Sequence, residues 1–175
     1  MRRWREADRE PFGVMNADAE VMRHFPAPLD RDASDALVDR IEARFEDQGF
    51  GLWALEVIAT GKFIGFTGLN PMPAGIPGGG GMEVGWRLER SAWHRGYATE
   101  AAHAAVGLAF GPIGLTELWS MTAVSNESSQ AVMRRLGMTH HAFFDHPSLP
   151  VGHPVRRKVV YHLLASETVG RQVDL

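Results

Sequence analysis

The stretch Glu83-Val-Gly-Trp-Arg-Leu-Glu-Arg-Ser-Ala-Trp-His-Arg-Gly-Tyr-Ala-Thr-Glu-Ala101 is the most informative part of the chain. Polar and apolar residues alternate from Met82 to Glu89, which is the pattern of a β-strand with one buried face. From about Gly96 to Phe110, alanines and other small residues recur at helical spacing, which predicts a helix packed closely on a sheet. The stretch therefore predicts a strand, a short loop and a helix.

The loop before this helix has the features of an anion site. The N–H groups of a first helical turn lack acceptors within the helix, and the helix dipole adds partial positive charge there. Gly96 permits a ligand to approach the backbone closely, and Arg95 adds a cation. The residues alone predict a phosphate or pyrophosphate at 95–99. A plain strand-to-helix turn, with Thr99 and Glu100 stabilising the helix start, is the alternative.

The rest of the chain adds helices and strands on both sides of this segment. Before it we expect helices over Glu6–Phe25 and Ala33–Gln48, the second capped by Asp32 or Ser34. A hairpin is expected over Gly51–Ile58 and Phe63–Leu69, followed by a loop over Pro71–Gly81. After it we expect a strand, a helix, two strands and a polar, frayed tail, over Leu118–Ala123, Asn126–Leu136, His140–Phe144, Arg157–Leu164 and from Ser166.

This order of elements predicts an α/β domain with a largely antiparallel sheet and one βαβ-like crossover. The length of 175 residues fits one domain over 1–175. A net charge of -3 argues against direct binding of nucleic acid through a basic surface. The chain has no cysteine, which excludes a thiol nucleophile and a thiolate metal site. No signal peptide or membrane-length apolar run is visible, so the expected compartment is the cytoplasm.

The loop also carries a family resemblance. Trp93-His-Arg-Gly96-Tyr-Ala98 is similar to the Gln/Arg-x-x-Gly-x-Gly/Ala loop with which GNAT N-acetyltransferases bind acetyl-CoA. Trp93 departs from the general pattern but resembles the RimJ/RimL-like branch, in which Gly-Tyr-Ala-Thr-Glu-Ala follows. The resemblance implies a mixed, twisted sheet flanked by helices, whose first edge strand is short or absent. It also implies a set of residues that bind acetyl-CoA or CoA: Trp86, Arg87 and Leu88 along the pantetheine arm, and Arg95, Gly96, Tyr97, Ala98 and Thr99 at the pyrophosphate.

Two further segments resemble the same branch. Asn126-Glu-Ser-Ser129-Gln-Ala-Val-Met-Arg-Arg-Leu-Gly137 is similar to its Asn-x-x-Ser-x-x-Val-x-x-x-Leu-Gly segment. This implies that Asn126 lies beside pantetheine and that the Ser129 hydroxyl lies near the CoA sulfur, where it would act as the acid. Taken separately, Asn126 is also a good helix N-cap, and Ser129 could satisfy an amide of the first turn. Phe144 to Tyr161 is similar to the closing hairpin of the branch.

Glu83 is the carboxylate that we expect to act as the general base. It lies on the polar side of the strand that leads to the loop, and Gly85 leaves space beside it. The alternative is a salt bridge between Glu83 and Arg87. The eight histidines show no metal-binding spacing, and no metal is expected.

The expected function is direct transfer of acetyl from acetyl-CoA to a primary amine, on either a small molecule or a peptide N-terminus. The alternative is a non-catalytic GNAT-fold module that holds CoA as a sensor or partner domain. The resemblance also allows a homodimer, and no membrane partner is expected.

Overall fold

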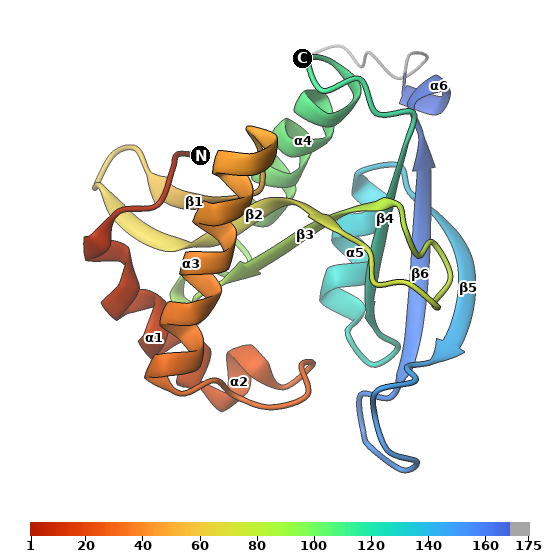
Figure 1. The fold of residues 1–175 in the computed structure, drawn as a ribbon, viewed down its shortest axis with the longest axis horizontal. Helices are drawn as coiled ribbons and strands as arrows, with labels where there is room; N and C mark the ends of the chain where they lie inside the picture. Colours follow the sequence, from red (N-terminus) through yellow and green to blue (C-terminus); the bar gives the residue numbers. More distant parts are fainter. Residues whose placement is uncertain (169–175) are drawn as a thin grey trace.

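The computed structural model describes residues 1–168, and within them six strands form one sheet (Figure 1). Strands β3 and β4 are parallel, and every other neighbouring pair is antiparallel. The connection from β3 to β4 passes through helix α4, which is the predicted crossover. In sheet order the strands are β1 Leu52–Val57, β2 Lys62–Pro71, β3 Met82–Leu88, β4 Glu117–Ala123, β6 Arg157–Leu164 and β5 Thr139–Asp145.

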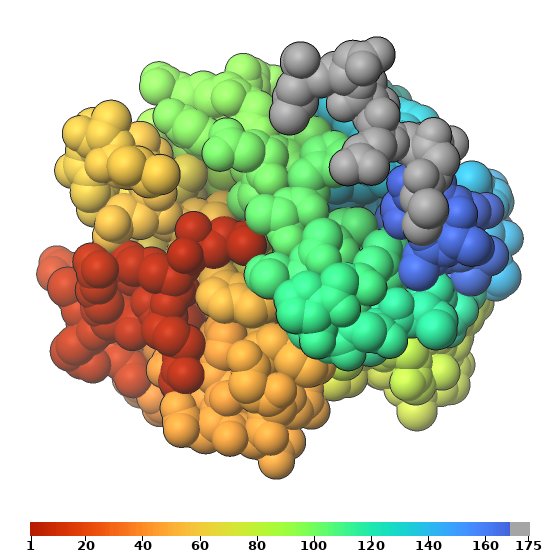
Figure 2. All heavy atoms as spheres, turned by 90° about the horizontal axis from the view of Figure 1, so that it is seen from above, coloured from red at the N-terminus to blue at the C-terminus, as the bar shows by residue number. Residues whose placement is uncertain are grey.

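Helices cover both faces of this sheet. Helices α4 and α5 pack on one face, while the amino-terminal helices and α3 pack on β1 and β2 from the other face. Figure 2 shows the amino-terminal helices and α3 on one side of the molecule and the carboxyl-terminal elements on the opposite side. The helices are α1 Arg9–Ala17, α2 Ala19–Met22, α3 Arg31–Gln48, α4 Tyr97–Phe110, α5 Glu127–Arg135 and α6 Ala165–Thr168, with 3₁₀ turns η1 Glu6–Asp8 and η2 Arg90–Ala92.

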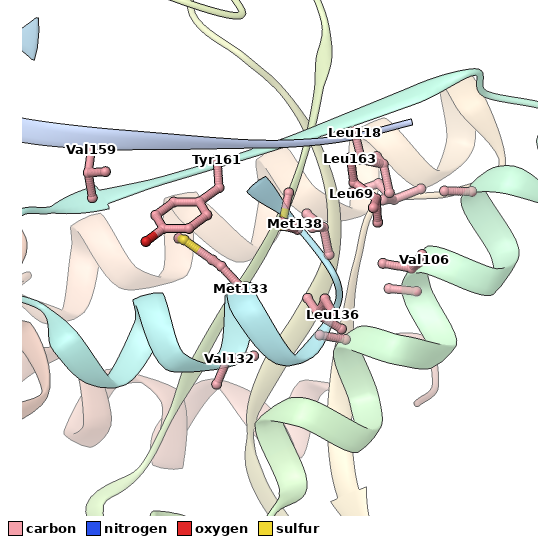
Figure 3. Close-up of a cluster of buried hydrophobic side chains, with 14 residues drawn as sticks. Leu69, Val106, Leu118, Val132, Met133, Leu136, Met138, Val159, Tyr161 and Leu163 are labelled. Atoms are coloured by element: carbon pink, nitrogen blue, oxygen red, sulfur yellow. The ribbon is translucent and has the colours of Figure 1, made fainter. Parts of the chain in front are cut away.

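The main core fills the space between the sheet and helices α4 and α5. Four residues of α4, three of them alanines, are buried, so the helix approaches the sheet closely, as its small residues predict. Figure 3 shows the Tyr161 ring pointing from β6 toward Met133 of α5, and both side chains are buried. A second core beneath α1 and α3 is aromatic: the Trp4 ring lies 4.8 Å from Phe12 and 5.5 Å from Phe63.

Strands β3 and β4 meet at one point and then separate. In the described chain, the only paired residues of this parallel ladder are Glu83 and Trp119. Figure 1 shows the two strands diverging toward their carboxyl ends. Beyond Glu83, the edge of β3 that faces β4 is therefore free of a strand partner.

The expected hairpin, the loop after β2 and the helix after β3 are confirmed, within one or two residues at most ends. The short first edge strand is confirmed as well, because it is reduced to a single bridge. Arg2 N–H donates to the Ala54 carbonyl and Ala54 N–H donates to the Arg2 carbonyl, both at 3.0 Å. The glycines of the loop have a packing role, since a Cβ on Gly78 or Gly81 would come within 2.8 Å of the Trp119 ring.

Three local expectations were wrong. The helix expected from Glu6 to Phe25 is broken at Asp18, whose backbone is extended and whose carboxylate accepts a hydrogen bond from the Glu20 N–H at 2.8 Å. The tail expected to fray from Ser166 instead forms the helical turn α6 through Thr168, and its remainder lies outside the described residues.

The cap of α3 is Asp30, not Asp32 or Ser34. The Asp30 backbone is extended, and its carboxylate accepts a hydrogen bond from the Ala33 N–H at 2.8 Å. Ser34 lies inside the helix and is fully buried. Its polar group is satisfied by Asn16, whose Nδ2 donates to the Ser34 hydroxyl at 2.8 Å.

Candidate functional site

The amino terminus of α4 is left uncapped by side chains in the described chain. Gly96 is the cap residue, and its φ of 83° is a left-handed conformation that favours glycine. The first bond of the helix runs from the Glu100 N–H to the Gly96 carbonyl at 3.0 Å. The N–H groups of Tyr97, Ala98 and Thr99 therefore have no acceptor within the helix. Together with exposed Arg95, they form a concentrated set of donors beyond the end of β3.

The open edge of β3 leads from the strand junction toward this helix terminus. At its far end the Glu89 N–H donates to the Ile64 carbonyl of β2 at 3.0 Å. Because backbone groups alternate in direction along a strand, those of Val84, Trp86 and Leu88 point toward β4 instead. The Val84 carbonyl accepts from Ser120 Oγ at 2.9 Å, and the Leu88 carbonyl accepts from Trp93 Nε1 at 2.8 Å. The N–H and C=O of Trp86 lie between them, where the two strands have separated.

Helix α5 starts on the other side of the gap between the strands. Asn126 caps this helix: its Oδ1 accepts from the Ser129 N–H at 3.2 Å, and its Nδ2 donates to Thr122 Oγ1 at 2.9 Å. The capping role weighed for Asn126 is thus confirmed, whereas the one weighed for Ser129 was wrong, because its own amide is the group that is capped. The Ser129 hydroxyl makes no hydrogen bond within residues 1–168, which leaves it available as a donor.

Glu83 has an unusual environment for a carboxylate. Its side chain is partly accessible, but protein surrounds the carboxylate closely and no cation of the described residues pairs with it. Asn70 Nδ2 donates to Glu83 Oε1 at 3.3 Å, and Asn70 in turn accepts from Arg44. Withdrawal from water raises the pKa of Glu83 to about 7, although the bond from Asn70 opposes this. The group can therefore take up or release a proton near neutral pH.

Arg87 does not form the salt bridge with Glu83 that was weighed as the alternative. Its guanidinium donates from Nη1 to Asn16 Oδ1 at 2.6 Å and lies 4.0 Å over the Phe25 ring. Its Nε is buried and unpaired in the described chain, and burial lowers the pKa of the side chain to about 10. The side chain thus points to the face of the sheet opposite α4. Gly85, between Arg87 and Glu83, keeps this face open, since a Cβ on it would meet no atom within 4 Å.

The predicted residues fall into three groups around the gap. The open edge at Trp86 and Leu88 leads toward the donors at 95–99, Asn126 and Ser129 stand across the gap, and Glu83 lies at the junction on the other face of the sheet. Arg87 does not belong to the open edge, because its backbone faces Phe66 of β2 and its side chain lies on the other face of the sheet. Asn70, the partner of Glu83, could not be identified from the sequence, because nothing in the chain marks which β2 residue lies opposite Glu83.

Lys158, a buried lysine of β6, could not be identified from the sequence either. Nothing in the sequence marks it, because Lys158 alternates with the core residues Val159 and Tyr161 and so matches an outward position of the strand.

The histidines and the helices carry no further assignment. His141 contacts Trp119 on one face of the sheet and His140 contacts Tyr161 on the other, as their adjacency predicts. Among residues 1–168, no group of three or more histidine, aspartate or glutamate side chains is arranged to hold a metal ion. In the same part of the chain, no helix combines the length and the apolar composition that a membrane span requires.

Comparison with known proteins places this geometry in a family. Residues 1–139 match the model of the acetyltransferase (GNAT) domain. FsC-acetyl coenzyme A-N(2)-transacetylase of Aspergillus fumigatus is 36% identical over 107 residues, which are 58% of this chain and 45% of that protein. An acetyltransferase structure from Agrobacterium tumefaciens has a TM-score of 0.75 and 28% identity, covering 93% of this chain and 88% of that one.

A structure of spermidine N-acetyltransferase from Vibrio cholerae in complex with CoA and spermine has a TM-score of 0.76. It is 14% identical and covers 96% of each chain, so it shows the fold alone. These likenesses confirm the expected fold class, a mixed and largely antiparallel sheet flanked by helices.

The environment of Glu83 predicts a particular dependence of stability on pH. Its folded pKa of about 7 lies above the ordinary value of about 4.3 for an unfolded chain, so the folded state binds more protons between these values. Stability due to Glu83 is fully present below about pH 4 and is lost as pH rises through 7. In Glu83→Gln, the free energy of unfolding measured in urea should decline less between pH 5 and 8 than in the wild type. Equal declines would show that the carboxylate titrates as it does in water.

Proposed function

The chain belongs to the GNAT acetyltransferase family, and we propose that it is a RimJ/RimL-like enzyme that transfers acetyl from acetyl-CoA to a primary amine by direct attack. The observation that carries the proposal is the gap between β3 and β4, with an open backbone edge on one side and an uncapped helix terminus beyond it. The names of the Aspergillus fumigatus relative and the Vibrio cholerae structure both describe acetyl transfer to nitrogen, which supports the amine as acceptor.

The described residues fit acetyl-CoA at two places. The amides at 95–99 and the Arg95 side chain would hold the pyrophosphate, because uncapped N–H groups at a helix start bind anions. The N–H and C=O of Trp86 would pair with the amide groups of pantetheine in the manner of an added strand. Asn126, on the far side of the gap, would border the same arm.

Acetyl-CoA, when bound, supplies an activated acyl group and a leaving thiol whose ordinary pKa is about 8.5. A backbone N–H near Trp86 would donate to the acyl oxygen as negative charge develops there. Glu83 would accept the proton of the amine, directly or through a water beside Gly85. A carboxylate with a pKa of about 7 suits this task, because about half of it is ionised at neutral pH and it is basic enough to take a proton. The unengaged Ser129 hydroxyl would donate to the departing sulfur.

A CoA-holding module without turnover would use the same cofactor residues. The raised pKa of Glu83 favours the enzyme over the module. Burying a carboxylate so that its pKa lies near 7 reduces stability, and this carboxylate has no role in holding CoA. The two functions differ in one measurement. Steady release of free CoA on addition of amines, screened over peptide N-termini, amino acids, polyamines and aminoglycosides, is expected of the enzyme. Binding of acetyl-CoA without release by any of these amines would favour the module.

Gly96 should be essential for binding acetyl-CoA. In Gly96→Val, the side chain would both strain the backbone at φ 83° and cover the N–H groups of the first turn, so we expect calorimetric affinity for CoA to fall at least ~10-fold. The matched control is Gly114→Val, at the opposite end of α4, where φ is 75° and the space is also open. Both variants should lose stability, but only Gly96→Val should lose affinity. Unchanged affinity for CoA in Gly96→Val would show that the pyrophosphate does not bind at this helix terminus.

Glu83 should make kcat/KM rise with pH near neutrality. Wild-type kcat/KM should increase as pH passes about 7, because Glu83 must lose its proton to act as a base. In Glu83→Gln we expect kcat/KM to fall ~10²-fold near pH 8, the size typical of a general base. The deficit should be small below pH 6, where Glu83 is protonated, and should narrow again where the amine itself deprotonates. Equal kcat/KM values for the variant and the wild type at every pH would show that bulk water, not Glu83, accepts the proton of the amine.

A further inference from the structure

Lys158 is a buried cation without a counter-ion. It lies on β6, between Ala123 of β4 and Phe144 of β5, and is 7% exposed. Residues 1–168 form no hydrogen bond or ion pair with its Nζ. Asp145, the acidic residue of the neighbouring strand β5, pairs with Arg156 and Arg157 instead. Burial lowers the pKa of Lys158, and no carboxylate opposes this. A buried charge that nothing pairs with reduces the stability of the fold.

The strand alternation places Lys158 on the same face of the sheet as Glu83. On β6, Val159 and Tyr161 belong to the core beneath α5, so Lys158 points to the opposite face, as do Val160 and its neighbour Trp119. Trp119 is the partner of Glu83 at the strand junction. The face that carries the proposed base therefore also carries the unpaired ammonium.

Arg87 stands at the matching level on the other arm of the gap. It is four residues beyond Glu83 on β3, and Lys158 pairs with Ala123, four residues beyond Trp119 on β4. Four strand residues span about 13 Å, so both cations lie roughly that far along their strands from the junction. Arg87 is also incompletely satisfied, with a buried Nε that has no partner within residues 1–168. A buried cation, Lys158, and a half-buried one, Arg87, thus lie on the face of Glu83 on either side of the gap.

The amino-terminal segment closes over the same region, and its acid there, Glu20, pairs with Arg23 and not with Lys158. His24, after α2, contacts Ser125 in the turn between β4 and α5, with Nδ1 and Oγ 3.4 Å apart. The pKa of His24 is lowered mainly by burial and by the charge of Arg23. The charge of Glu20 opposes the shift, and that of Lys158 adds to it. The pKa of His146 is lowered by burial and by Lys158 as well. No carboxylate of residues 1–168 therefore pairs with Lys158.

We propose, resting on the acetyl transfer proposed above, that the acceptor is a primary amine that also carries a carboxylate, and that Lys158 binds this carboxylate. The amine would lie near Glu83 and Gly85, and the carboxylate would lie toward the mouth of the gap. A carboxylate at Lys158 offsets the cost of the buried ammonium through a charge-assisted hydrogen bond. A polyamine such as spermine would instead bring like charge against Lys158 and Arg87, so this face selects against polycations.

The strand geometry limits the separation of the two groups. A peptide advances about 3.3–3.6 Å per residue, and the side chain of Lys158 shortens the distance that the acceptor must span. We therefore expect the amine and the carboxylate to be separated by the length of about two to four residues. Oligoglycines with two to four residues provide a series of this length. Each free acid has a matched amide that differs only in the carboxylate.

The first test compares kcat/KM for each oligoglycine acid and its amide, with spermidine in parallel. The wild type should prefer one acid over its amide by at least ~10-fold, and Lys158→Met should reduce this ratio to about 1 without changing the affinity for acetyl-CoA. Lys158→Gln is the second variant should the first fold poorly. The control is Lys62→Met, the other lysine of the chain, which is exposed and pairs with Glu89; it should keep the wild-type ratio.

A peptide amide with an internal aspartate, compared with its asparagine form, separates a side-chain carboxylate from a terminal one, and preference for either acid supports the proposal. Equal rates for acids and amides, a preference for spermidine, or a preference that persists in Lys158→Met would overturn it while leaving acetyl transfer intact.

A binding measurement decides the case in which no amine is acetylated. With only two lysines, labelling with [15N]lysine gives two side-chain ammonium signals. Adding N-acetyl-triglycine to the CoA complex should shift the Lys158 signal, and adding its amide should not. If no amine is acetylated but the Lys158 signal shifts, the proposed enzymatic function is rejected and the carboxylate site is supported. No shift, or the same shift with the amide, would reject the carboxylate site.

Discussion

The rest of the site depends on the single junction between β3 and β4. The strands pair at Glu83 and Trp119 and then separate, so a sheet that is continuous elsewhere opens at its centre. An interior strand with an unpaired edge is costly, because backbone N–H and C=O groups lose the partners that burial requires. Here Ser120 and the Trp93 ring satisfy the carbonyls at Val84 and Leu88, and the groups at Trp86 remain open between them. A ligand with amide groups can complete this edge, as pantetheine does in the proposed function.

The charges around the junction have a common feature, which is that they lack partners of opposite sign. Glu83 is close to one amide donor, Arg87 pairs with a neutral asparagine, and Lys158 has no partner among the described residues. At the amino terminus, by contrast, arginines pair with carboxylates: Arg2 with Asp8 and Glu56, and Arg9 with Asp39. Isolated buried charges reduce stability, so their concentration on one face of the opened sheet is a mark of a site that interacts with a ligand.

Much of the fold could be predicted from local patterns. Alternation over Met82–Glu89, the turn at Gly61 and the small residues of α4 each specify an element through nearby residues, and each is confirmed. The cap of α3 could not be read in this way, because Asp30, Asp32 and Ser34 all suit an N-cap. Which residue caps the helix depended on where the preceding chain turns and on Asn16, which donates a hydrogen bond to the Ser34 hydroxyl. The break at Asp18 has the same origin, since the two short helices must follow the surface of β1 and β2.

By itself, the sequence determined the class of the domain, the loop at Gly96, and the candidates Glu83, Asn126 and Ser129, because these depend on residue types at short spacing. The tertiary structure alone decided which charges meet. It separated Arg87 from Glu83, set Asn70 against Glu83, and left Lys158 buried on the face of the proposed base. The physical reason is that strand register and the divergence of β3 from β4 arise from packing between distant segments, and the environment of a charge follows from that packing.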